Sequence, residues 1–187
     1  MGIIKVKNCF LRENKVSLKR HKIRAKEKWV MADNIFRYSI KAIIIKENKI
    51  LVEQVDQGRG VFYKLPGGGH HFGETIHEAL LRELKEELGI EAEIGQLLFV
   101  RDYLAKNHDM EFDDPNFQQT ELMFLCHVKD FSTLGQGTEP DKNQIICWKA
   151  AEELAQIKFF PKKLVSYLTN LSKLQEQKET IYLGDVN

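Results

Sequence analysis

Cysteine is scarce in this chain of 187 residues, and long apolar runs are missing from it. The three cysteines, Cys9, Cys126 and Cys147, form no C-x-x-C pair, so neither a disulfide framework nor a zinc site is supported. Apolar runs such as Ala42–Ile45 are far too short to span a bilayer, and no signal-peptide pattern is evident. We therefore expect a cytoplasmic protein without a membrane partner.

The net charge of +1 hides an uneven distribution of charge along the chain. Ten of the 28 Lys and Arg residues, but only two of the 27 Asp and Glu residues, fall within positions 1–30. The remaining 18 basic and 25 acidic residues make an acidic body, which disfavours nonspecific binding to nucleic acid. We interpret residues 1–33 as a basic extension. It either contacts RNA or an acidic partner, or plays no part in catalysis.

Residues 34–187 have the length and composition of one globular domain. Apolar periodicity and turn residues predict strands at 37–45, 50–55, 61–65, 92–103, 120–128 and 144–148, the fourth folded back at Gly95-Gln96. Helices are predicted at 76–88, 150–157 and 161–174, with the last two covering the sheet opposite the first. The tail segment Ile181–Leu183 is either an edge strand or a contact in a homodimer.

The stretch from Leu65 to Ile90 concentrates the features that point to chemistry. Three consecutive glycines after Pro66 force a turn whose backbone can approach a ligand closely. Thr75 and Glu78 have the spacing of a capping box, and Gly89 suits a left-handed C-terminal cap. The sequence thus predicts a glycine-rich loop that leads directly into a capped helix.

Three carboxylates, those of Glu83, Glu86 and Glu87, fall on neighbouring positions of this predicted helix. Like charges at such spacing repel by a few tenths of a kcal/mol per pair. A hard divalent cation would offset that repulsion, because Mg²⁺ takes oxygen ligands from a few carboxylates and from substrate phosphates. The alternative is an ordinary solvated acidic face, but the glycine loop just before the helix favours the metal.

The same stretch resembles the Nudix box, G-x5-E-x7-R-E-U-x-E-E-x-G-U with U apolar, at every fixed position from Gly68 to Ile90. The resemblance implies an α/β fold, the Nudix α/β/α sandwich with a mixed β-sheet. It further implies hydrolysis of a nucleoside diphosphate linked to another group, with Mg²⁺ or Mn²⁺ as the cofactor. The metal would be held by Gly68, Glu83, Glu86 and Glu87. Glu74 and Arg82 would form a clamp that braces the loop.

The general base and the substrate contacts are less clearly marked. Glu87 and Glu139 rank together as candidates for the base, with Glu86 and Glu121 behind them; a solvated loop residue is the alternative for Glu139. Arg37, Arg101 and Glu121 are candidate substrate contacts, although Arg101 also reads as an ordinary surface arginine. His70 and His71 lie in the x5 stretch of the box, which is variable in the family, so they either contact phosphate or a second metal or are ordinary surface residues.

Substrate choice stays open at this level. The downstream proline and tyrosine that mark ADP-ribose pyrophosphatases and diadenosine polyphosphate hydrolases are both missing, since Ala105–His108 occupy those positions. ADP-ribose, a nucleotide sugar and a (deoxy)nucleoside triphosphate remain candidates. Two other functions are alternatives: a nucleotide-sensing Nudix module without catalysis, and an RNA 5′ pyrophosphohydrolase that holds RNA through residues 1–30.

Overall fold

The structure, a computed structural model, describes residues 35–187 except 57, 59, 109–113 and 140–142. The basic extension predicted at residues 1–33 lies outside the described residues. The strands are β1 (Ile35–Lys46), β2 (Lys49–Asp56), β3 (Val61–Lys64), β4 (Glu93–Leu104), β5 (Phe117–His127), β6 (Gln144–Ala150), β7 (Phe159–Phe160) and β8 (Ile181–Asp185). The helical elements are α1 (Ile76–Glu83), η1 (Leu84–Leu88), η2 (Ala105–Asn107), α2 (Ala151–Leu154), η3 (Lys162–Leu164), α3 (Val165–Leu168) and α4 (Leu171–Glu176).

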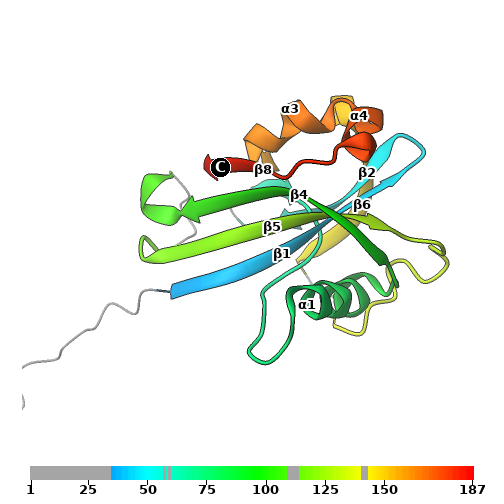
Figure 1. Cartoon of the computed structure of the whole chain (residues 1–187), viewed down its shortest axis with the longest axis horizontal. Coiled ribbons are helices and arrows are strands. Elements are labelled where there is room, and N and C mark those ends of the chain that lie inside the picture. Colours follow the sequence, from blue (N-terminus) through cyan, green and yellow to red (C-terminus); the bar gives the residue numbers. More distant parts are fainter. Residues whose placement is uncertain (1–34, 57, 59, 109–113, 140–142) are drawn as a thin grey trace, which may run out of the picture. The chain divides into compact units, whose positions relative to one another are not determined.

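Strand β1 joins the two halves of a mixed sheet (Figure 1). It runs parallel to β5 from Ile35, opposite Phe117, to Ile44, opposite Cys126. Its pairing with β2 is antiparallel and confined to the hairpin end, at Ile45 and Lys46. The strand order is β7-β3-β2-β1-β5-β4-β8, and β6 also pairs with β2. Because β1 and β2 pair only at the hairpin, side chains of both halves line one cavity beyond it.

Helices cover both faces of this sheet (Figure 1). Successive residues of a strand point to opposite faces, so β1 contributes to two cores. Ile40, Ala42 and Ile44 pack on one face against the apolar side of α1 and η1. Ile43 packs on the other face with leucines of α2, α3 and α4. The α/β/α sandwich with a mixed sheet is thereby confirmed, and so is the placement of the C-terminal helices opposite α1.

The turn predicted at Gly95-Gln96 was wrong, since β4 runs unbroken through both residues. Its pairing with β5 shifts register between Ile94 and Leu97 and again before Phe99, so the strand bends instead of reversing. A Cβ on Gly95 would lie 2.9 Å from the carbonyl oxygen of Leu125. Gly95 therefore allows the two strands to approach closely and does not form a turn.

The C-terminal helices are shorter than their apolar periodicity predicted. The predicted helix 161–174 is interrupted at Thr169 and Asn170, where the Asn170 side chain accepts a hydrogen bond from the Lys173 amide and starts α4. The predicted helix 150–157 is confined to α2. The tail forms β8, an edge strand parallel to β4, as one of its two interpretations expected. Among the described residues, no helix is long and apolar enough to cross a membrane.

Candidate active site

The glycine loop lies against β1 because its residues have no side chains there. The amide of Ile40 donates to the carbonyl of Gly68 over 2.9 Å. At Gly67, where φ is +111°, a Cβ would lie 2.3 Å from the Ile40 carbonyl oxygen. At Gly68 a Cβ would meet the carboxylate of Glu83 at 2.5 Å, so this glycine forms a cradle for that carboxylate.

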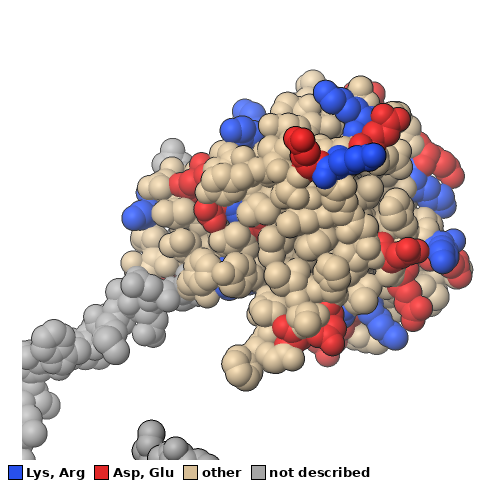
Figure 2. Space-filling view, in the orientation of Figure 1, with Lys and Arg blue, Asp and Glu red and all other residues tan. Residues whose placement is uncertain are grey.

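The capping box predicted at the start of α1 is confirmed. The Glu78 amide donates to Thr75 Oγ1 over 3.2 Å, and the Thr75 amide donates to Glu78 Oε2 over 2.7 Å. The helix continues through the wider turn η1 to Gly89, which adopts the left-handed conformation at φ +74°. In this view Figure 2 shows acidic side chains gathered over α1 and the loop before it.

Arg82 is the centre of the clamp and links the loop to the helix. Its guanidinium donates to Glu74 at 2.8 and 3.0 Å and to the Gly69 carbonyl at 3.0 Å. It also donates to Glu83 at 2.8 Å and to Glu86 at 3.0 Å. The hydrogen bonds from Arg82 lower the pKa of Glu74 to about 2. The predicted contact between Glu74 and Arg82 is therefore present, and it extends to two of the proposed metal ligands.

The three box carboxylates have different surroundings. Glu83 is buried against Gly68, while Glu86 is partly exposed beside Arg82. Glu87 turns inward, and its buried Oε2 has no hydrogen-bond partner among the described residues. Burial, and next the charge of Glu53, raises the pKa of Glu87 to about 7. Arg82 engages both Glu83 and Glu86, and no three acidic, His or Cys side chains of the described residues converge as a ready-made ligand set.

Sequence reasoning missed a charged cluster next to Glu87. It consists of Lys41, Glu53 and Lys64. Lys64 Nζ lies 3.0 Å from Glu53 Oε2, although neither Glu53 oxygen meets hydrogen-bond geometry with a described donor. Lys41 Nζ donates to the Gly67 carbonyl. Burial, and next the charge of Lys64, lowers the pKa of Lys41 to about 8. The available signal was a charged residue directly beside an apolar run, at Lys41 before Ala42–Ile45 in β1 and at Glu53 after Ile50–Val52 in β2.

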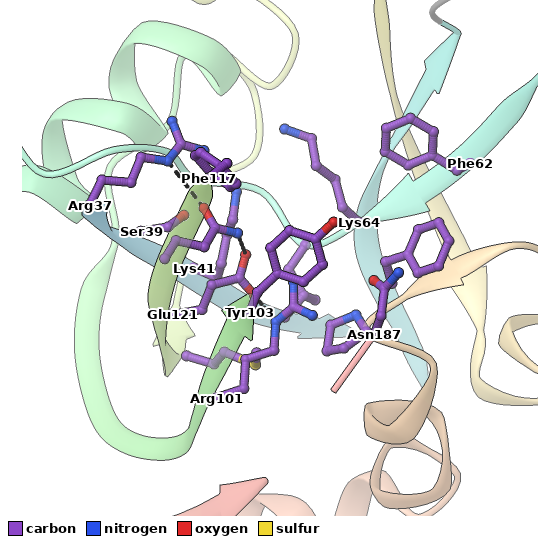
Figure 3. Close-up of a pocket in the computed structure, with 15 residues that line it drawn as sticks. Arg37, Ser39, Lys41, Phe62, Lys64, Arg101, Tyr103, Phe117, Glu121 and Asn187 are labelled. Atoms are coloured by element: carbon purple, nitrogen blue, oxygen red, sulfur yellow. Dashed lines mark hydrogen bonds and ion pairs between the residues drawn. The ribbon is translucent and has the colours of Figure 1, made fainter. Parts of the chain in front are cut away.

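The cluster borders a pocket between the two halves of the sheet (Figure 3). Most of its lining comes from strands, with Arg37, Ser39 and Lys41 from β1, Phe62 and Lys64 from β3, Arg101 and Tyr103 from β4, Phe117, Gln119 and Glu121 from β5, and Phe160 from β7. Figure 3 shows Tyr103 and Phe117 on one side of the cavity and Phe62 across from them. The three candidate substrate contacts therefore meet in one place, although 84 positions separate Arg37 from Glu121 in the chain.

A chain of polar contacts orders one wall of this pocket. Arg37 Nε donates to Gln119 Oε1 at 3.1 Å, and Gln119 Nε2 donates to Glu121 Oε1 at 2.9 Å. Arg101 Nε donates to Glu121 Oε2 at 2.5 Å. Burial alone would raise the pKa of Glu121, but the adjacent Arg101 outweighs it and lowers that pKa. The surface reading of Arg101 was wrong, because this residue is only 5% exposed.

Other predicted residues lie away from the pocket. The Glu139 side chain is exposed, and its amide donates to the Glu86 carbonyl at 2.9 Å, which ties its loop to η1. A Cβ on Gly137 would lie 2.3 Å from that same carbonyl oxygen, so the loop packs closely on the helix end. His70 Nε2 contacts the Glu74 carbonyl, and the His71 amide donates to the Glu74 carboxylate. Both histidines thus contact the loop itself.

A mixed sheet between two helical layers, with a glycine loop leading into a clamped acidic helix, is the Nudix arrangement. The chain belongs to the Nudix family, since the family model described as NUDIX domain matches residues 36–170. It is similar to Nudix hydrolase 2 of Arabidopsis thaliana, with 31% identity over 141 residues that cover 72% of this chain and 47% of that protein. It is also similar to CTP pyrophosphohydrolase of Escherichia coli strain K12, with 32% identity over 124 residues, 65% of this chain and 82% of that protein.

Comparison with solved structures agrees with the family assignment. A MutT Nudix hydrolase from Burkholderia pseudomallei matches with a TM-score of 0.56 and 26% identity. The match covers 73% of this chain and 99% of that one. The chain spans about half the length of the Arabidopsis relative but most of the length of the bacterial protein.

Proposed function

We propose that this protein is a divalent-metal-dependent hydrolase that cleaves the diphosphate linkage of a nucleoside diphosphate derivative. ADP-ribose, a nucleotide sugar and a (deoxy)nucleoside triphosphate are the candidate substrates. The observation that carries the proposal is the contact between the pocket and the glycine loop of the box. Lys41 lines the pocket and donates to the Gly67 carbonyl, and the next residue, Gly68, lies directly against the Glu83 carboxylate. A ligand in the pocket would therefore lie close to the loop that holds the box carboxylates.

The residues at the box fit a hard cation such as Mg²⁺ or Mn²⁺. Both ions prefer carboxylate and carbonyl oxygens. The buried Oε2 of Glu87, to which no described residue donates, and the carboxylate of Glu83 in its glycine cradle supply such atoms. We assign the metal to the Gly68 carbonyl and to the side chains of Glu83, Glu86 and Glu87. When bound, the ion neutralises diphosphate charge and lowers the pKa of a water molecule.

The pocket offers separate features for the two parts of such a substrate. Arg37, Lys41 and Lys64 bring positive charge to the side nearest the box, which attracts a diphosphate. Phe62, Phe117 and Tyr103 line the pocket, where a nucleobase can pack against their rings; one face of Tyr103 is already stacked on His108. The guanidinium of Arg37 lies over the Phe117 ring, 5.3 Å from its centroid, and is in no ion pair with a described residue. We assign Arg37 to a phosphate oxygen.

Position favours Glu87 over Glu139 as the group that accepts a proton from the attacking water. Glu87 lies beside the charged cluster that borders the pocket, whereas the Glu139 side chain is exposed. A general base must come within hydrogen-bond reach of the proton that it removes. Glu139 is the second candidate for the general base, because its loop is hydrogen-bonded to η1 next to Glu86 and Glu87.

The experiment that tests this proposal is a hydrolysis screen with Mg²⁺ or Mn²⁺. The panel contains ADP-ribose, nucleotide sugars, dinucleoside polyphosphates, CTP and other triphosphates, and capped RNA, with Glu87→Gln as the blank. One preferred substrate that the variant leaves uncleaved would support the proposal and name the reaction. No cleavage by the wild type, with a nucleotide-induced rise in Tm, would replace the proposal by a nucleotide-sensing module.

A further inference from the structure

Strand β8 (Ile181–Asp185) lies beyond residues 36–170, the span that the family model matches. It pairs in parallel with β4, placing Ile181 opposite Phe99 and Tyr182 opposite Val100. The chain stays against β4 beyond the strand, because the Val186 amide donates to the Asp102 carbonyl at 3.3 Å. This edge of the sheet belongs to the pocket, since Arg101 and Tyr103 of β4 both line it.

The first link between β8 and the pocket runs through Arg101. Its Nη1 donates to the Val186 carbonyl over 2.5 Å, while its Nε is held by Glu121. One acceptor on β5 and one just after β8 thus fix the guanidinium, whose carbon lies 5.3 Å from the Tyr103 ring centroid. The next residue, Asn187, lines the pocket itself (Figure 3). An amide side chain carries both donors and an acceptor, which suits the polar edge of a nucleobase.

The second link runs through Asp185 and supports Tyr103 from behind. The Asp185 carboxylate contacts the Leu104 amide at 3.0 Å, Asn107 Nδ2 at 2.7 Å and His108 Nε2 at 2.7 Å. The His108 ring stacks on Tyr103 with centroids 5.2 Å apart and an interplanar angle of 11°. Asp185 therefore orients the imidazole that lies flat against this pocket residue.

We infer that residues 185–187 form the nucleoside-binding wall of the pocket, with Asp185 as a positioning residue for Tyr103 and Asn187 as a substrate contact. This inference rests on the proposed function for the identity of the ligand. The wall is attached to β4 and contains none of the box carboxylates, so its loss weakens substrate binding more than the chemical step. Binding lost equally from the ground state and the transition state raises KM and leaves kcat unchanged.

Strand β8 also offers a matched control. Tyr182 Oη donates to Asp102 Oδ2 at 2.5 Å, and Asp102 also accepts from Thr120 Oγ1 at 2.7 Å. Asp102 alternates with Arg101 and Tyr103 along β4, so it points to the other face of the sheet. Tyr182→Phe therefore removes an attachment of the same strand without touching the pocket.

The test compares Asp185→Ala, Asp185→Asn, Asn187→Ala and Tyr182→Phe. We would measure Tm, KM and kcat on the preferred substrate of the panel, and calorimetric Kd values for ADP and CDP without divalent metal. Asp185→Ala should raise KM and Kd about tenfold, as a weakened base-stacking contact does, with kcat nearly unchanged. Asp185→Asn keeps an acceptor and should restore part of the loss. Tyr182→Phe should change Tm but neither constant.

Unchanged Kd values in Asp185→Ala, or an equal rise in Tyr182→Phe, would overturn the inference. If Asp185→Ala does not fold, unchanged Kd values in both Asp185→Asn and Asn187→Ala would overturn the inference. Failure of the wild type to bind either ADP or CDP would also overturn it. The two proposals fail differently. Suppose that the wild type cleaves nothing in the panel but that its Asp185 variants bind nucleotide more weakly than it does. That result would refute the proposed hydrolase activity and support the proposed nucleoside-binding wall.

Discussion

Gly68→Ala is a sharp test of the proposed metal site, because the added methyl group would enter the place of a carboxylate. The ideal Cβ at Gly68 lies 2.5 Å from Glu83 Cδ and Oε2 and 2.6 Å from Oε1. Non-bonded carbon atoms are at their best about 3.5–4.0 Å apart, so the carboxylate must retreat by roughly 1 Å. The backbone at Gly68 is not in the left-handed region, and a side-chain end can move, so the fold should survive the change.

The expected loss falls on the site and not on stability. Metal ligands are held within about 0.2 Å of their ordinary distances, and a displacement of about 1 Å in an active site can reduce rates roughly 100-fold. We therefore expect turnover to fall about 100-fold and Mn²⁺ binding to weaken, with little change in Tm. Mn²⁺ titration calorimetry, hydrolysis kinetics and thermal unfolding measure the three quantities.

Gly67→Ala is the control for this prediction. Its Cβ would lie 2.3 Å from a backbone oxygen of Ile40, which cannot yield, and its φ of +111° is unsuited to alanine. That variant should lose stability, and its activity should fall with the folded fraction. Gly68→Ala with wild-type Mn²⁺ affinity and wild-type turnover would refute the assignment of Gly68 and Glu83 to the metal site.

Three further changes probe the clamp, the pocket wall and the base. Arg82→Ala removes the hydrogen bonds to Glu74, Glu83 and Glu86 and should lower turnover through a loosened loop; unchanged rate and Mn²⁺ affinity would contradict the clamp. Glu121→Gln leaves Arg101 buried without its charged partner and should lower the unfolding free energy by about 3 kcal/mol, measured by urea denaturation. The folded-state pKa of Glu121 is lowered from 4.5, so its stabilisation is present above that value and lost as pH falls through the folded pKa. The difference between wild type and Glu121→Gln should therefore shrink on acidification, and a pH-independent difference would be contrary to this. Glu139→Gln should leave the rising limb of the pH–rate profile intact, whereas a flattened limb would return the role of base to Glu139.

Local features of this protein were determined by the sequence alone. The capping box at Thr75, the left-handed Gly89 and the turn at Gly67 depend on interactions within a few residues, and the structure has all three. The contact of Glu74 with Arg82 spans only eight positions and was also expected. The apolar runs of β1, β2 and β5 predicted these strands because buried strands leave a continuous hydrophobic signal.

Tertiary structure decided what those elements bring together. The Arg37–Gln119 contact spans 82 positions and Arg101–Val186 spans 85, so neither has a local pattern that could reveal it. Lys41 and Glu53 each lie beside an apolar run, and only the packing of β1, β2 and β3 around Glu87 gives them a common environment. The sequence predicted a turn at Gly95, because the residue that faces a glycine on the next strand is unknown until the strands pair. Burial, charge pairing and strand register depend on contacts between segments that are distant in the sequence. Only the folded structure brings those segments together.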